Sequence, residues 1–127
     1  PLNPFDATFR SFEKQVLPEI IRRGAAVIGT KPFAGGAIPA GKLIKPEDAL
    51  RYVWSLPVSS VLVGCDSTAL LKRSIKSAAS FKAFHAGEMD AIRQKAKPTA
   101  GDGRFERYKT TQEFDGAPGL AAHGFLK

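Results

Sequence analysis

Two apolar stretches, AAVIGT at residues 25–30 and SSVLVG at residues 59–64, decide the fold that we expect for this chain. Neither alternates between apolar and polar side chains, which is typical of strands buried on both faces of a parallel sheet. Pro32 closes the first stretch, and Pro57 precedes the second. Because helical patterns alternate with these strands, the chain is expected to form right-handed βαβ units of the α/β class.

Four segments with apolar residues at helical spacing surround the two strands. Residues 17–24 end in two arginines and a glycine, which suit a helix terminus. Residues 45–57 open with a proline followed by two acids, and residues 66–79 open with two capping side chains. The fourth helix is expected over residues 87–97, closed by a proline. Residues 98–127 have no clear period and are expected to form an irregular tail that packs on the body.

Composition limits the chain to few classes of protein. Its 127 residues allow one domain, and 43% hydrophobic residues exclude wholesale disorder despite a net charge of +7. One cysteine excludes an internal disulfide, and two distant histidines offer no local metal pair. No apolar run reaches the roughly 18 residues that span a bilayer, and no leader sequence opens the chain. We therefore expect a cytoplasmic protein without a membrane partner or a metal site.

Two loops follow the carboxyl ends of the expected strands, where parallel α/β proteins bind ligands. They are residues 31–36 and residues 64–67. The second leads into a helix N-terminus, whose free N–H groups favour a phosphate, although Asp66 and Ser67 would also serve as ordinary helix caps. Four cations and no acid lie between Asp66 and Glu88. Such a run forms a solvated helix face or faces an anionic cofactor; without interleaved aromatic residues, nucleic acid is not expected.

Other motifs carry weaker signals. Residues 36–43, GAIPAGKL, resemble a phosphate-binding loop but have leucine where magnesium needs a hydroxyl, so we reject this interpretation. Cys65 precedes a helix N-terminus without a positioned base, and His85 and His123 lie in a link and in the tail. Packing or surface roles are expected for all three.

Several segments, taken in order, resemble the carboxyl-terminal part of an aldo/keto reductase of the bacterial type. They are LNPFD at 2–6, LPEIIRRGAAVIGTKPFAGG at 17–36, ALRYVWSLPVSSVLVGCDS at 49–67, DGRFERYKTT at 102–111 and FDG at 114–116. The resemblance implies that residues 1–127 are the C-terminal portion of a (β/α)8 TIM barrel. Residues 25–30 would be its seventh strand and residues 60–63 its eighth.

The resemblance also implies a binding site for NADP or NAD. The loop after the seventh strand would hold the nicotinamide and pyrophosphate side through Thr30, Lys31 and Phe33. The eighth strand's loop and the next helix would hold the adenosine phosphate and adenine; the residues at these positions are Gly64, Asp66, Ser67, Leu70, Arg73 and Ser74. Thr30 replaces the aromatic ring that many members stack on nicotinamide, and Gly64 replaces a basic contact, so the choice between NAD and NADP stays open.

The function implied by the resemblance is NAD(P)H-dependent reduction of a small carbonyl substrate. The family's catalytic Asp, Tyr, Lys and His belong to the amino-terminal half of the barrel, which residues 1–127 do not include, so no catalytic residue is assigned. The isolated chain is expected to be inactive. The alternative is a non-catalytic binding or assembly module, because open sheet edges favour self-association or pairing with a complementary half-barrel.

Overall fold

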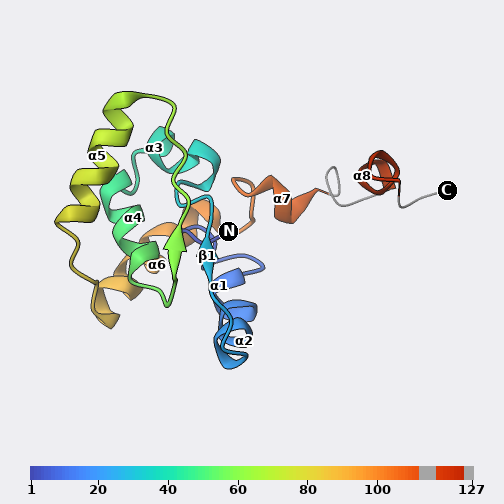
Figure 1. The fold of residues 1–127 in the computed structure, drawn as a ribbon, viewed down its shortest axis with the longest axis horizontal. Helices are drawn as coiled ribbons and strands as arrows, with labels where there is room; N and C mark the ends of the chain where they lie inside the picture. Colours follow the sequence, from blue (N-terminus) through green and yellow to red (C-terminus); the bar gives the residue numbers. More distant parts are fainter. Residues whose placement is uncertain (112–116, 125–127) are drawn as a thin grey trace.

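The computed structural model describes residues 1–111 and 117–124, and Figure 1 shows its ribbon. Helices make up most of these residues, and the helix α4 lies between α5 and the two strands in Figure 1. The elements in order are α1 (Phe12–Gln15), α2 (Leu17–Arg22), β1 (Ile28–Gly29), η1 (Ala34–Gly36), α3 (Ala37–Gly41), α4 (Pro46–Trp54), β2 (Ser60–Val61), α5 (Thr68–Ala79), α6 (Ala86–Ala100), α7 (Arg107–Thr110) and α8 (Ala117–Ala122).

The prediction that residues 1–127 form the C-terminal portion of a TIM barrel is wrong. The described residues contain one sheet of two parallel strands, and each strand has only two residues. Ile28 pairs with Ser60, and Gly29 pairs with Val61. The segment beside β1 on its other side is the N-terminal segment and not a third strand. Leu2 N donates to Thr30 O there, over 2.9 Å. Without continued strand pairing a barrel wall cannot form, because each strand needs hydrogen-bonded neighbours on both sides.

One face of this small sheet is uncovered. Ile28 and Leu62 are about 60% exposed, at 60% and 61%, although both are large and apolar. Residues two apart on a strand point to the same face, so the pairing of Ile28 with Ser60 places Leu62 on the side of Ile28. Val27 and Gly29 point the other way and are buried. The strands are therefore buried on one face, and not on both as their apolar runs predicted.

Three expected helices are confirmed near their predicted starts. The helix α2 begins at Leu17 and is followed by Gly24 with a φ of 67°, the left-handed conformation expected of a terminating glycine. Pro46 occupies the first turn of α4. Ser67 is the N-cap of α5, and its hydroxyl accepts from Leu70 N over 3.2 Å.

Two predictions about the C-terminal part of the chain are partly wrong: the end of the fourth helix and the irregular tail. The helix α6 does not stop at Pro98 but continues to Ala100. Ala96 and Ala100 are buried, and Thr8 Oγ1 donates to Ala100 O over 2.9 Å, so packing holds the last turn despite the missing N–H of the proline. The tail also includes the helical segments α7 and α8. Within it, Phe114 of the FDG segment lies outside the described residues.

The core surrounds α4, whose apolar face serves two clusters. Ala49 and Leu50 pack with Phe5, Phe33 and other residues from the loops and α6. One turn later, the buried Tyr52 and Val53 join the cluster with Leu2, Leu17, Val27 and Met89. This central helix therefore fixes the positions of the strand ends and of α5, which packs beside it.

Candidate functional site

The carboxyl ends of β1 and β2 open into a groove of about 540 Å³ between the two expected loops. Lys31, Phe33 and Gly35 line it from the first loop, and Gly64 and Asp66 line it from the second. Parallel pairing brings the two loops together, since both strands end at the same edge of the sheet. Five of the nine expected site residues line this groove: Lys31, Phe33, Gly64, Asp66 and Leu70.

The first loop has a well-defined backbone shape. Lys31 and Ala34 adopt positive φ angles of 52° and 50°, and Gly35 and Gly36 follow with 65° and 94°. Two turn hydrogen bonds support this path, from Ala34 N to Lys31 O and from Gly36 N to Phe33 O. An added Cβ at either glycine would meet no atom within 4 Å. The glycines are therefore needed for backbone conformation, and their environment remains open toward the groove.

Lys31 supplies the cation of this groove. Its ammonium lies 4.3 Å from the ring centroid of Tyr108, within the range of a cation–π contact. Asn3 Nδ2 donates to the Lys31 carbonyl over 3.2 Å and to Glu106 Oε1 over 3.1 Å. The N-terminal segment and α7 thus hold Lys31 from behind, while the lysine itself lines the groove.

The N-terminus of α5 forms the other wall. Ser67 is used as the cap, so its hydroxyl is already engaged with Leu70 N. Leu71 N bonds the Ser67 carbonyl over 3.1 Å, which completes the first turn. The amides of the first helical positions point out of the helix, as at any helix start, and the adjoining Asp66 lines the groove. A carboxylate there can accept hydrogen bonds from hydroxyl groups of a ligand.

Two expected site residues lie elsewhere. Arg73 donates to Glu47 Oε1 through Nε (3.1 Å) and Nη2 (2.5 Å), and this lowers the pKa of the Glu47 carboxyl. Ser74 is buried, and its hydroxyl has no partner among the described residues. It borders a void of about 10 Å³ near Glu47, close to the smallest that holds one water. Both residues lie a turn along α5 from Leu70 and face α4, not the groove.

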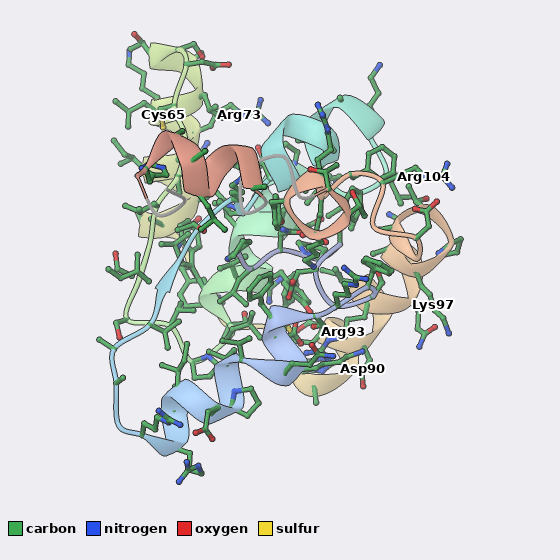
Figure 2. All side chains as sticks on the ribbon, turned by 90° about the vertical axis from the view of Figure 1, so that its right-hand side faces the viewer. Cys65, Arg73, Asp90, Arg93, Lys97 and Arg104 are labelled. Carbon is green, nitrogen blue, oxygen red and sulfur yellow. The ribbon has the colours of Figure 1, made fainter. Side chains whose placement is uncertain are left out.

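One further expected site residue, Thr30, lies beside the groove, and Cys65 and His85 had packing or surface roles expected of them. Thr30 directly follows β1, and its carbonyl accepts from Leu2 N. Cys65 is exposed and lines the groove. Figure 2 shows Cys65 and Arg73 at one end of the molecule, away from Arg93 and Asp90. His85 is the N-cap of α6 and forms a capping box with Glu88, which is more specific than the packing or surface role expected of it.

A buried polar network that sequence reasoning missed supports the Lys31 loop. Lys109 Nζ lies 2.6 Å from Asp6 Oδ1 and 2.6 Å from Glu106 Oε2. Tyr108 donates to Glu106 Oε1 over 2.5 Å, and burial, followed by the Glu106 carboxylate, raises the pKa of this phenol. The residues come from opposite ends of the chain, so no local sequence signal joins them.

A second missed network connects α1, α4 and α6. Tyr52 donates to Glu13 Oε2 over 2.5 Å, and Arg93 Nη2 donates to Glu13 Oε1 over 2.6 Å. Arg93 Nε also donates to the Tyr52 hydroxyl over 2.9 Å. Burial, followed by the Glu13 carboxylate, raises the pKa of Tyr52. The network lies between packed helices, which indicates a role in holding them together.

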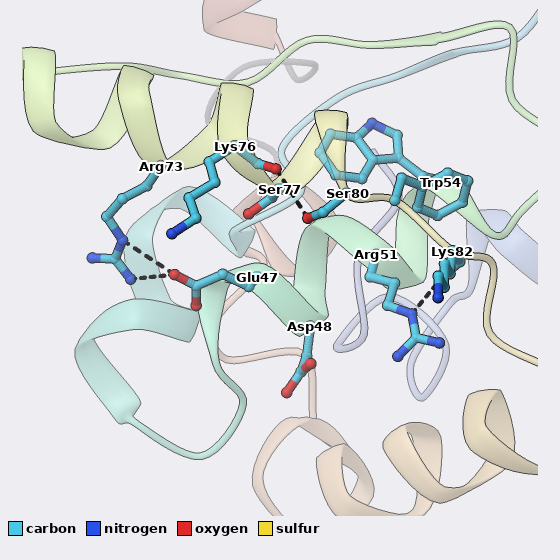
Figure 3. Close-up of a pocket in the computed structure, with 10 residues that line it drawn as sticks. Glu47, Asp48, Arg51, Trp54, Arg73, Lys76, Ser77, Ser80 and Lys82 are labelled. Carbon is cyan, nitrogen blue, oxygen red and sulfur yellow. Dashed lines mark hydrogen bonds and ion pairs between the residues drawn. The ribbon is translucent and has the colours of Figure 1, made fainter.

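A second groove, of about 560 Å³, runs between α4 and α5 (Figure 3). Its cations include Arg73 and Lys76, and Trp54 and Phe81 line its apolar side. The sequence identified these cations as a basic run but placed them at the cofactor rim. These cations lie in a separate groove because α5 packs against α4. The periodicity of the sequence does not predict which helices pack together.

Within residues 1–111 and 117–124, no three His, Cys, Asp or Glu side chains come together as a metal site would require. None of the helices in these ranges combines the length and apolar character needed to cross a bilayer. Comparison of the chain with protein-family models, curated proteins and solved structures found no match.

Proposed function

We propose that the groove at the strand ends binds the phosphate-bearing part of a nicotinamide cofactor, NADP or NAD. The observation that carries this proposal is the meeting of residues 31–36 and 64–70 in one groove beyond two parallel strands. This is where nucleotides bind in proteins with parallel strands. Lys31 would attract a phosphate oxygen, and Asp66 would accept a hydrogen bond from a ribose hydroxyl.

The proposed activity is NAD(P)H-dependent reduction of a small carbonyl compound, to which this chain contributes the cofactor groove. The bound nicotinamide supplies the hydride. Lys31 orients the cofactor from one loop, Phe33 anchors that loop in the core, and the start of α5 forms the opposite wall. Proton donation to the carbonyl is not assigned to any residue of the groove.

Isothermal titration calorimetry of the chain with NADPH and with NADH, at low salt, tests the proposal. Lys31→Met keeps the length of the side chain but removes its charge, so it is expected to weaken binding about tenfold. Lys95→Met is the matched control, because Lys95 is exposed on α6 and lines neither groove. Absence of saturable binding, or equal weakening by both variants, would overturn the proposal.

The uncovered sheet face favours a second candidate function, self-association as an assembly module. Ile28 and Leu62 form an exposed apolar pair on one face of the sheet, which another copy of the chain could cover. Light scattering is expected to show a dimer that Ile28→Lys or Leu62→Lys dissociates. Ile21→Lys, on α2, should leave it intact. A monodisperse monomer across a wide range of concentrations would contradict this candidate.

A further inference from the structure

The groove between α4 and α5 is separate from the cofactor groove. It is as large, at about 560 Å³, and the two share no lining residue. Its lining residues include Glu47 and Trp54 of α4, Arg73 and Ser77 of α5, and Ser80, the C-cap residue that follows α5. Phe81 and Lys82 close it from the link that follows α5. It therefore requires a ligand of its own.

The side chains that line the groove carry a net positive charge, and one of its cations is paired with one of its carboxylates. Four cations and two carboxylates line it: Arg51, Arg73, Lys76 and Lys82, with Glu47 and Asp48. Asp48 points away from α5 in Figure 3, whereas Lys76 extends from α5 toward the Arg73–Glu47 pair. Within residues 1–111 and 117–124, Glu47 forms its ion pair with Arg73 and not with Lys76. An anion is therefore favoured next to Lys76.

Polar hydrogen-bonding groups surround the position of that anion. The hydroxyls of Ser77 and Ser80 lie between Lys76 and Trp54 in Figure 3. Ser80 Oγ donates its one hydrogen to the Lys76 carbonyl over 3.0 Å, so this hydroxyl has no hydrogen left for a phosphate oxygen. Ser77 is partly exposed at the groove and can donate to a phosphate oxygen. One ammonium and an adjacent hydroxyl are suitable partners for a phosphate.

An aromatic wall adjoins the polar end. The rings of Trp54 and Phe81 meet edge to face, with centroids 5.7 Å apart and planes at 73°. Phe81 is 39% exposed, although it is large and apolar. Arg51 fixes this wall, because its Nε donates to the Lys82 carbonyl over 2.6 Å and its guanidinium lies 3.8 Å from the centroid of the Phe84 ring. A planar ring would find an exposed stacking surface here.

We propose that the α4–α5 groove binds a small aromatic phosphate of the nucleoside monophosphate class. The phosphate lies against Lys76 and Ser77, and the planar ring packs on Phe81 beside Trp54. This arrangement combines a cation, one hydroxyl donor and an aromatic wall within one groove, and the site is distinct from the cofactor groove because its residues are different. Ordinary surface lysines lack the neighbouring ring pair.

Trp54 is the only tryptophan of the chain and lines the groove, so its fluorescence reports binding directly. Titration with AMP is expected to quench it along a saturable curve, corrected against free tryptophan. Adenosine should bind about tenfold more weakly, since it lacks the phosphate, and inorganic phosphate should not quench. Lys76→Met and Phe81→Leu should each weaken AMP binding about tenfold while the far-UV circular dichroism is unchanged.

Two matched variants make the result decisive. Lys72→Met removes the same charge from the same helix but outside the groove, so it should leave AMP affinity within about twofold of the parent. Lys31→Met should also leave it unchanged, which separates this site from the cofactor groove. The proposal is overturned if AMP gives no saturable quenching up to about 1 mM. It is equally overturned if Lys72→Met weakens binding as much as Lys76→Met, because general charge attraction would then explain the effect.

Discussion

The ammonium of Lys109 lies 2.6 Å from the carboxylate of Asp6, although 103 residues separate them along the chain. Their side chains are only 2% and 0% exposed. Lys109 also donates to Glu106 and to the Phe9 carbonyl, so all three of its N–H groups have acceptors. Asp6 in turn accepts from the backbone amides at the start of α1. This pair therefore fastens α7 to the N-terminal segment.

Replacement of Lys109 by methionine should strongly destabilise the protein. It leaves two buried carboxylates, Asp6 and Glu106, without their shared cation, and breaking a buried pair costs about 3–5 kcal/mol. Urea denaturation measures the loss in unfolding free energy. Lys97→Met, at an exposed position, is the control and should change it by less than about 0.5 kcal/mol. A similar small change for Lys109→Met would show that the pair does not hold the fold.

Both tyrosines should remain protonated in the folded protein above about pH 10, where an exposed phenol ionises. Burial, with Glu13 or Glu106 beside them, raises the pKa of Tyr52 and Tyr108 above that value. The folded state then binds more protons than the unfolded state, so the unfolding free energy is fully present below about pH 10 and falls as the pH rises further. Tyrosinate absorbance followed with and without denaturant checks this.

Tyr52→Phe supplies the control for the alkaline effect. It removes one of the two titrating phenols, so the fall in unfolding free energy at high pH should become shallower. Normal ionisation of both phenols in the folded protein would contradict the burial of their hydroxyls.

Local features of the sequence were sufficient for several elements. The helix α4 follows from a proline and two acids at its start and from its apolar face, and α5 follows from the Ser67 cap. The two loops at the strand ends were also identified, because apolar runs mark the strands that precede them. These signals lie within a few residues of the structure they determine.

Features that depend on distant partners could not be predicted in this way. Two apolar hexapeptides predicted buried strands of a parallel sheet, and the family resemblance implied that they belong to a barrel. The strands pair over only two residues each, and the segment beside Thr30 is Leu2 and not another strand. Arg73 and Ser74 were expected at the cofactor, but packing against α4 turns them toward Glu47. In each case, the partner that decides the outcome has no fixed spacing along the chain.

Three glycine-to-alanine substitutions should rank by backbone conformation and space. Gly103 has a φ of 74°, and an added Cβ would lie 2.4 Å from Phe9 Cδ1, so Gly103→Ala combines strain with a clash and should cost about 2–4 kcal/mol. Gly24 has a φ of 67° but open space, and its replacement should cost about 1 kcal/mol. Gly41→Ala meets neither obstacle and should be close to neutral. Thermal denaturation of the three variants tests this order; equal stabilities would contradict it.

The Arg93–Glu13 pair should contribute far more to stability than the exposed Arg104–Asp102 pair, although the two have similar N–O distances of 2.6 and 2.7 Å. Glu13 is 8% exposed, so Arg93→Met leaves a carboxylate in a poorly solvated position and should cost about 3 kcal/mol. Arg104→Met affects a solvated pair and should lower the unfolding free energy far less than Arg93→Met does.

A double variant separates the buried charge from other effects of the substitution. Glu13→Gln removes the carboxylate that Arg93→Met leaves unpaired, so the double variant should be more stable than the sum of the two single losses predicts. Unfolding free energies from urea denaturation of all four proteins give this coupling. Strict additivity would mean that Arg93 stabilises the helices through the packing of its aliphatic stem and its contacts with Asp90 and Tyr52, because no energy would then depend on Glu13.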